Sequence, residues 1–455
     1  MKENVTIDFE RTKVSTLFKR LFFPTLLGML SVSAVTTIDG IFVGHGVGSD
    51  GIAAVNLCIP LLMVLTGVGL MVGAGSSVIS SIYLSRGKGG LARASVTQAL
   101  LLVTVVTLVL NLGIAMFPGQ TAQVLGASEH LRPMVVDYLL WFMPSLVFEL
   151  WIAVAMFALR LDGSPRLAMW CSIVAAVVNV VFDWLFIFPL GWGVKGAALA
   201  TSLSCMAGAV PAMVYLLSHA RHLRLHPLCL GRRGAVFFFR NIGVQCKVGS
   251  SALLGEATMA VLMFTGNHVF MHHWGDAGVG AFGVSCYYLP FVFMIGNAIV
   301  QSAQPIISFN FGKGSLGRVR EAFRVSVIAA VACGAVSTTA FVCFPQLLVG
   351  LFLPSGDAAA RIAVDGFPYY GTAFVFFILN LTVIGYYQSL ERIRPATAFA
   401  LMRGFVFMVP CFLLLPEALG TPGVWLALPS SEILTFLCIA VFMLSTNRPS
   451  GRQPA

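Results

Sequence analysis

The sequence predicts an all-α polytopic membrane protein with twelve transmembrane helices in two six-helix lobes. Composition, the length of the apolar blocks and repeated motifs together predict this fold class. The chain has 455 residues, of which 58% are hydrophobic and 10% are charged, whereas soluble proteins carry about 25% charged residues. Its mean hydropathy is +0.90. This composition excludes both an ordinary soluble fold and a disordered chain.

The apolar residues fall in blocks of about 20 or more, long enough to cross a hydrocarbon core of roughly 30 Å. The first block carries Asp39 and further spans follow it, so we interpret it as an uncleaved first helix. The predicted spans are 16–41, 52–82, 96–117, 132–158, 168–190, 196–218, 242–271, 279–309, 322–345, 363–388, 396–416 and 423–445.

Basic residues fall almost entirely on one side of these spans. Of the 28 Lys and Arg residues, all but Arg132, Lys195 and Arg361 lie in segments that face that side. Positively charged loops stay in the cytoplasm, so both termini are predicted to be cytoplasmic. The basic excess therefore reflects membrane topology, and we expect no nucleic-acid partner.

Several motifs recur in the second half of the chain. Residues 87–93 (GKGGLAR) match residues 312–318 (GKGSLGR) 225 residues later, and residues 48–54 match residues 275–281 at an offset of 227. We predict an N-terminal lobe over 1–218, a cytoplasmic linker over 219–241 and a C-terminal lobe over 242–455. An even number of spans gives both lobes the same orientation, as in transporters whose parallel halves rock around a site between them.

Motifs that the sequence lacks exclude other functions. It contains no Walker A sequence for ATP hydrolysis and neither an HExxH motif nor a nucleophile–base pair. The ten cysteines include no CxxC and no zinc-like spacing. We therefore expect no enzyme, no cofactor and no metal centre.

Two aspartates of the first lobe lie within apolar segments, where an ionisable residue costs about 2.5–3.5 kcal/mol and suggests a function. Asp39 follows Arg20 by roughly 28 Å of helix, and Asp183 follows Arg166 by roughly 25 Å. Asn179 lies one turn before Asp183 on the same face. We predict that the two carboxyl groups lie at similar depth and face each other.

Such a pair would take up a proton at near-neutral pH, or hold Na⁺ with help from Asn179, because two desolvated carboxylates do not both ionise freely. Pro24 interrupts the hydrogen-bond ladder of the first helix, so the change in charge is predicted to bias a proline hinge. The alternative is that Asp39 is a helix-end residue near Gly40, stabilised by interfacial water.

Polar residues of the later spans are candidates for substrate binding. Glu256 and Glu432 are predicted to lie near mid-membrane, and Gln301 and Gln304 precede Pro305 in the eighth span. A carboxylate that faces a cavity at this depth suits a cationic ligand. The alternative for each glutamate is a neutral carboxyl group, hydrogen-bonded between helices. Glu149 is not included in the predicted site.

Five segments together resemble the multidrug and toxic compound extrusion (MATE) family over essentially the whole chain, in particular its bacterial multidrug exporters with first-lobe aspartates. The segments are 37–44 (TIDGIFVG), 160–166 (RLDGSPR), 179–183 (NVVFD), 304–308 (QPIIS) and 423–427 (GVWLA). The resemblance implies a V-shaped pair of bundles around a central cavity, and drug export in exchange for H⁺ or Na⁺.

The resemblance also implies roles for single residues. The family's first-lobe ion site corresponds here to Asp39, Asn179, Asp183 and Thr201. Pro24 is similar to the proline implicated in bending the first helix, and Glu256 resembles a seventh-helix acid of other branches. Residues 383–388 carry no acid where some Na⁺-coupled relatives have an aspartate, which argues against a second-lobe Na⁺ site.

We therefore predict a secondary active antiporter of a bacterial inner (plasma) membrane, which exports amphipathic, mainly cationic organic compounds by alternating access. Its expected partners are small organic substrates and the lipid bilayer, and we expect a monomer. The alternative is a flippase for lipid-linked saccharides. A flippase should line its cavity with several arginines for pyrophosphate, and only Arg403 is predicted to lie within a span.

Overall fold

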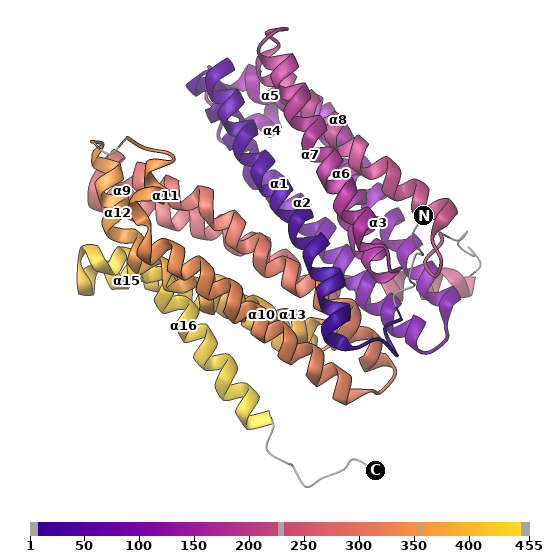
Figure 1. Cartoon of the computed structure of the whole chain (residues 1–455). Helices are drawn as coiled ribbons and strands as arrows, with labels where there is room; N and C mark the ends of the chain where they lie inside the picture. The colour runs from indigo at the N-terminus through magenta and orange to yellow at the C-terminus, as the bar shows by residue number, and fades with distance from the viewer. Residues whose placement is uncertain (1–7, 226–231, 355, 447–455) are drawn as a thin grey trace. The chain divides into compact units, whose positions relative to one another are not determined.

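The computed structural model describes residues 8–225, 232–354 and 356–446, and over these residues it is helical without β-strands (Figure 1). The principal helices are α1 (Val14–Gly46), α2 (Ser49–Ser85), α3 (Gly89–Met116), α4 (Pro118–Val124), α5 (Arg132–Phe142), α6 (Leu146–Leu161), α7 (Pro165–Ile187), α8 (Gly193–Val214), α9 (Arg232–Gly312), α10 (Leu316–Cys343), α11 (Pro345–Gly350), α12 (Ala358–Gly371), α13 (Ala373–Ser389), α14 (Ile393–Leu401), α15 (Met408–Leu419) and α16 (Thr421–Thr446).

Eleven helical segments within the described residues are long and apolar enough to cross a membrane. The long α9 supplies two of them, since its backbone breaks at Gly275, which has a φ of 59°. A twelfth span arises if α12 and α13, bent by 46° at their junction, cross together. The predicted all-α membrane fold is thus confirmed, with the tenth predicted span built from two helices.

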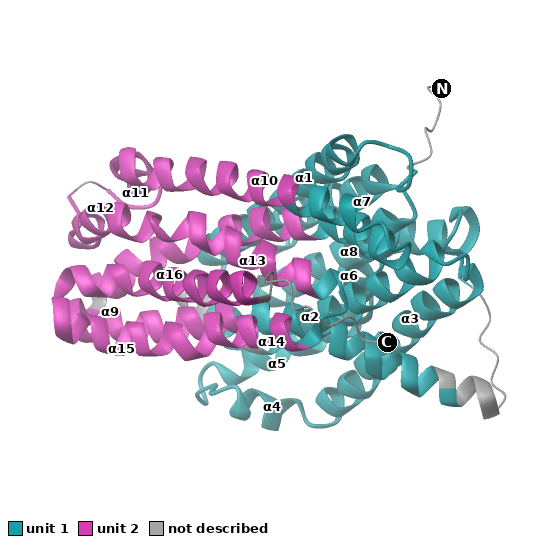
Figure 2. Ribbon diagram, turned by 90° about the horizontal axis from the view of Figure 1, so that it is seen from below, with its two compact units in different colours: residues 1–256, 301–323, 388–393 teal, residues 257–300, 324–387, 394–455 magenta. Residues whose placement is uncertain are grey.

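The chain divides into two compact units (Figure 2). Unit 1 comprises residues 1–256, 301–323 and 388–393, and unit 2 comprises residues 257–300, 324–387 and 394–455. The predicted linker 219–241 falls partly on residues 226–231, outside the described residues, and α9 begins at Arg232. The lobe boundaries stay a prediction, and both chain ends lie outside the described residues.

In unit 1, α2 and α6 are central: α2 packs against α3 and α6, and α6 against α8. Their inward faces form an apolar core with fully buried residues such as Leu146, Leu150 and Val154. Glycines allow close approach: a Cβ at Gly75 would collide with the Gln245 backbone of α9, and one at Gly249 with the backbone of α2. The first part of α9 therefore packs directly on α2.

Unit 2 is held by aromatic packing. The Phe341 ring lies 4.8 Å from both the Phe367 and the Phe374 rings, and the Trp425 ring lies 4.7 Å from Phe270. Gly366 lies against the indole of Trp425 without room for a Cβ. Offset and edge-on pairs of this kind add about 0.5–1.5 kcal/mol each beyond their burial.

Large apolar side chains remain exposed on both units, which fits a chain that faces lipid. Leu112 of α3 is 64% exposed and Leu444 of α16 is 72% exposed. On a soluble protein such surfaces would promote aggregation, but in a bilayer they contact acyl chains.

Candidate functional site

The candidate site lies in unit 1, where α1 packs along α7 and α7 packs against α8 (Figure 1). Gly28 of α1 lies against α7. A Cβ at Gly28 would lie 3.4 Å from the Met169 backbone and 3.5 Å from the Ser172 side chain. Small residues of α1 and α7 are thus in contact at this point, and the packing of the two helices brings the polar residues nearer the end of α1 to α7.

The predicted meeting of Asp39 and Asp183 is what the structure shows. Their carboxyl groups lie within hydrogen-bonding reach of each other. Asp183 is fully buried, whereas Asp39 is half-buried. A proton or cation can therefore reach the pair from the side of Asp39. Since Asp39 contacts Asp183, it is not an isolated helix-end residue.

Asn179 and Thr201 complete the same cluster. The Asn179 Nδ2 donates to the Thr201 Oγ1 over 3.4 Å, and the Thr201 hydroxyl donates to the Ala197 carbonyl over 3.0 Å. Because Thr201 uses its proton within α8, its oxygen is an acceptor toward Asn179. Asn179 is 2% exposed, and its side-chain carbonyl oxygen has no hydrogen-bond partner, so this oxygen is free to bind a ligand.

The cluster has more acceptors than donors, and its amide donor, the Asn179 Nδ2, is already bound to Thr201. Within the described part of the chain, Asp39 Oδ1, both carboxyl oxygens of Asp183 and Asn179 Oδ1 are buried without a hydrogen-bond partner. Buried polar atoms are nearly always satisfied, and two carboxylates in contact repel unless a proton or cation lies between them. These oxygen atoms could bind a proton or act as ligands to a monovalent cation. The described residues contain no group of three His, Cys, Asp or Glu suited to a metal ion.

The predicted hinge is linked to two other helices through Arg160, which lies just beyond the predicted span 132–158. Arg160 lies in the last turn of α6 and is 5% exposed. Its Nε donates to Thr25 Oγ1 over 3.1 Å, directly after Pro24, and its Nη1 donates to Gln301 Oε1 over 2.6 Å. The arginine thus ties α1, beside its proline, to α6 and α9.

The two glutamines predicted to bind substrate are both engaged with protein groups. Gln301 accepts from Arg160, and the Gln304 Nε2 donates to the Ala74 carbonyl of α2 over 2.9 Å. Both are buried. Their amides thus connect α9 to α6 and α2, and their role toward a substrate stays a prediction.

Glu256 lies beside a second acid, Glu149, which is not part of the predicted site. Glu256 is 8% exposed, packs near Gly67 of α2, and no described residue hydrogen-bonds its carboxyl group. The neighbouring Thr66 donates to Glu149 Oε1 over 2.6 Å, and the charges of Glu149 and Glu256 influence each other. Unit 1 therefore holds a second carboxylate pair.

Glu432, the other predicted substrate residue, is paired in unit 2. Its Oε1 lies 2.8 Å from the Arg403 Nε, with both residues 2% exposed. The Asn380 Nδ2 donates to its Oε2 over 2.7 Å, and the Arg403 guanidinium lies 4.1 Å from the centre of the Phe377 ring. As placed, the charge of Glu432 is already neutralised.

Three residues near the site were missed from the sequence: Arg160, Glu149 and Tyr138. The buried Tyr138 of α5 lies within electrostatic range of the Asp39, Asp183 and Glu149 carboxyl groups. The local sequence around Tyr138 gives no sign of this, because its partners come from three other helices. Arg160 begins the segment 160–166, whose Gly and Pro residues predict a loop, but the structure places Arg160 in the last turn of α6.

The fold and the site define a multi-pass helical membrane protein whose first bundle buries a pair of carboxyl groups without donors. The MatE family model matches residues 24–185 and again residues 252–413, which agrees with the internal repeat. The chain belongs to the MatE family.

Curated relatives match the chain over nearly its full length. The multidrug export protein MepA of Staphylococcus aureus (strain MSSA476) is 24% identical, with 98% of each chain covered. MepA of Staphylococcus saprophyticus is also 24% identical, with the same coverage.

Solved structures share the fold. An outward-facing multidrug resistance MATE family transporter of the MOP superfamily superposes with a TM-score of 0.88 at 18% identity, covering 98% of this chain and 100% of that one. A mutant of the Vibrio cholerae MATE transporter VcmN superposes with a TM-score of 0.87 at 18% identity, covering 96% and 98%.

Proposed function

We propose that the chain is a secondary active antiporter that exports amphipathic, mainly cationic organic compounds in exchange for H⁺ or Na⁺. We place it in a bacterial inner membrane with both termini in the cytoplasm, as a monomer without enzymatic activity. The relatives named as multidrug export proteins support the transport of drugs. The observation that carries ion coupling is the donor-poor cluster of Asp39, Asp183 and Asn179.

The cluster suits the coupling of ion binding to transport, because its net charge changes when H⁺ or Na⁺ binds. A proton between Asp39 and Asp183 removes one negative charge from a buried site, and a Na⁺ ion does the same without forming an O–H bond. Emptying the site restores two carboxylates in contact, which favours their separation. Since the two aspartates belong to α1 and α7, ion release would loosen the contact between these helices.

Pro24 is where α1 can respond. Proline removes one backbone hydrogen bond from the ladder, so a helix bends there at lower cost. Arg160 holds the next residue, Thr25. We infer that α1 bends at Pro24, so that the part of the helix that carries Asp39 moves when the ion binds or leaves. Such a helix has two conformations, and the charge of the ion site decides between them.

Recognition of a cationic substrate is assigned to Glu256, with Glu149 as its neighbour. An unpaired carboxyl group that is nine-tenths buried attracts an organic cation, because ion and carboxylate both gain from pairing in a low-dielectric site. Glu432 is a weaker candidate because Arg403 already neutralises it. The same pair weakens the flippase alternative, since Arg403 has a carboxylate partner and is less able to bind pyrophosphate.

Transport in proteoliposomes tests the proposal. Efflux of a cationic dye would be followed with an imposed proton gradient and, separately, with an imposed Na⁺ gradient. Asp39→Asn and Asp183→Asn should each abolish ion-driven efflux while the protein still inserts and purifies normally. Asp137→Asn is a matched control, because Asp137 is a partly exposed partner of Lys195 and should transport normally. Wild-type rates in both site variants would refute coupling at this cluster.

A further inference from the structure

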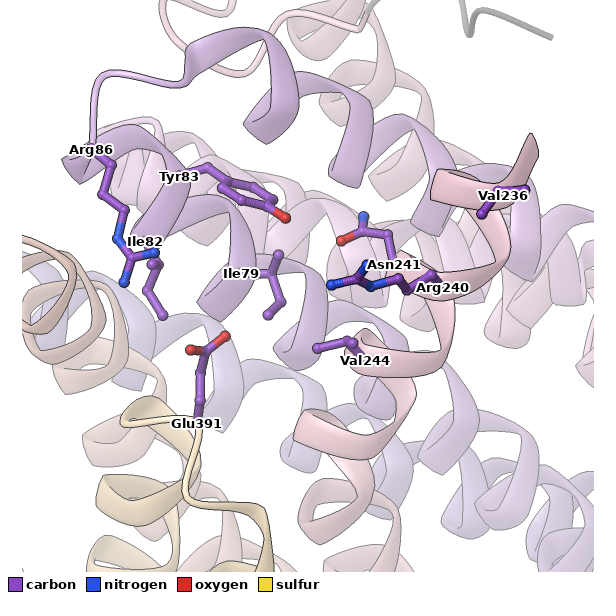
Figure 3. A pocket seen from close by; sticks show the side chains of 9 residues that line it. All are labelled: Ile79, Ile82, Tyr83, Arg86, Val236, Arg240, Asn241, Val244 and Glu391. Atoms are coloured by element: carbon purple, nitrogen blue, oxygen red, sulfur yellow. The ribbon is translucent and has the colours of Figure 1, made fainter. Parts of the chain in front are cut away.

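A cavity of about 460 Å³ lies in unit 1 beyond the coupling site (Figure 3). It is formed by the end of α2, the first turns of α9 and residue 391. Arg86 and Arg240 line it, together with the hydroxyl-bearing ring of Tyr83 and the carboxylate of Glu391. Its volume lies within the ~300–1,000 Å³ typical of small-molecule sites, and none of the residues invoked for ion coupling borders it.

The cavity carries one net positive charge. Its two guanidinium groups face one carboxylate, and in Figure 3 Arg86 and Arg240 enter from opposite sides. In the described ranges, neither guanidinium group has a hydrogen-bond or ion-pair partner in the protein. Asn241 is different, since its Nδ2 donates to Ser95 and Gln98. The arginines are thus free to bind an anion with a single charge.

Glu391 is held at the cavity by an unusual backbone conformation. It is the one non-glycine residue with a positive φ, 56°, in the described chain. Such strain is common at functional positions. Burial raises the pKa of the Glu391 carboxyl group, and the nearby Arg86 partly offsets this. Glu391 thus opposes a bound anion and can be neutralised by a proton.

One wall of the cavity is apolar and continues onto the lipid-facing surface. Ile79 and Ile82 of α2 are buried behind it, while Val236 of α9 is 65% exposed. Phe239, on the same stretch of α9, is 74% exposed. In a membrane protein such exposed apolar residues contact acyl chains, and this part of α9 enters its candidate span at Phe238. The cavity therefore lies at the end of a span, the level at which a lipid headgroup meets its tails.

We propose that this cavity binds the phosphodiester headgroup of an anionic phospholipid, with the phosphate between Arg86 and Arg240 and the acyl chains along Val236. Guanidinium groups bind phosphate oxygens by charge-assisted hydrogen bonds, and basic pockets at the cytoplasmic face commonly hold such headgroups. A phosphodiester carries one negative charge and so matches the net charge of the cavity. Free phosphate could use the arginines but not the apolar wall.

Binding to the purified full-length protein in detergent tests this proposal. Native mass spectrometry would compare dioleoylphosphatidylglycerol with dioleoylphosphatidylcholine, and inorganic phosphate would be a separate probe. We expect phosphatidylglycerol to bind at least about tenfold more tightly than phosphatidylcholine, and Arg86→Gln or Arg240→Gln to weaken it by about tenfold each. Arg20→Gln is the matched control, because Arg20 is exposed on α1, and should leave binding unchanged.

Glu391→Gln supplies a gain-of-binding test that misfolding cannot imitate. Removing the opposing carboxylate should tighten phosphatidylglycerol binding severalfold. In the wild type, lowering the pH should also tighten binding, because burial raises the pKa of the Glu391 carboxyl group and its protonation removes the negative charge that faces Arg86 and Arg240. Glu391→Gln should abolish that pH dependence.

Equal affinity for the two lipids would overturn the proposal, as would unchanged binding in the double variant Arg86→Gln/Arg240→Gln. Displacement of the bound phosphatidylglycerol by millimolar inorganic phosphate would identify a free-phosphate site and would also overturn it. Each of these results is independent of dye transport, so the coupling proposal is not affected by them.

Discussion

The buried ion pair of unit 2 permits a quantitative prediction. Glu432 and Arg403 are each 2% exposed and lie 2.8 Å apart. Replacing Glu432 with Leu leaves the guanidinium group of Arg403 in the interior without its carboxylate partner. One of its nitrogens, Nη2, is already without a partner among the described residues. Removing one partner of a buried pair costs about 3–5 kcal/mol, and we expect Glu432→Leu to reach that range.

The reverse replacement should cost less. In Arg403→Met the carboxyl group of Glu432 can take up a proton and become neutral, and the Asn380 Nδ2 still donates to it over 2.7 Å. We therefore expect about 2 kcal/mol, mostly from the lost hydrogen bonds to Arg403. In the double variant Arg403→Met/Glu432→Leu no charge remains, and apolar replacements of a buried pair are often neutral or stabilising. Its stability should lie within about 1 kcal/mol of the wild type.

The free energy of unfolding can be measured by titrating SDS into the purified protein in mild micelles and following tryptophan fluorescence. The double-mutant cycle isolates the pair. A Glu432→Leu variant as stable as the wild type would refute the reasoning, and so would a double variant as unstable as the worse single one. If the double variant also exports dye normally, Glu432 is a structural residue rather than a substrate contact.

Three further variants test unit 1. Pro24→Ala should slow the turnover of dye export more than it weakens dye binding, and an unchanged turnover would count against the hinge. Glu256→Gln should reduce efflux of cationic dyes selectively, whereas equal loss for neutral substrates would indicate a folding defect. Arg160→Met should lower the free energy of unfolding by about 2 kcal/mol, through the two lost charge-assisted hydrogen bonds, and should slow turnover, whereas wild-type stability and turnover together would show that the contacts to Thr25 and Gln301 are unimportant.

Much of the first-lobe cluster could be predicted from the sequence. The similar depth of Asp39 and Asp183 follows from counting helical rise from basic anchors, and Asn179 shares a helix face with Asp183 by spacing. These are local, periodic properties, and the structure brings the two aspartates together as predicted. Thr201 entered only through the family resemblance, because a threonine within an apolar helix carries no local sign of its partner.

The partners of the other polar residues could not be predicted. Arg160 and Gln301 are 141 residues apart, and Glu149 and Thr66 are 83 apart. A lone glutamate in a span suggests either a ligand site or a buried contact, and only the packing of helices decides between them. Glu432 pairs with Arg403, 29 residues away, whereas Glu256 lies beside another acid, Glu149.

By itself, the sequence determined that the chain is a helical membrane protein with about twelve spans, since bilayer thickness and the cost of burying charge act on every segment separately. It also placed Asp39, Asp183, Glu256 and Glu432 within apolar segments. The pairing of these groups depends on the packing of helices that are distant in sequence. The folded structure therefore shows what the sequence does not: Glu432 pairs with an arginine, Asp39 contacts Asp183, and Arg86 and Arg240 line one cavity.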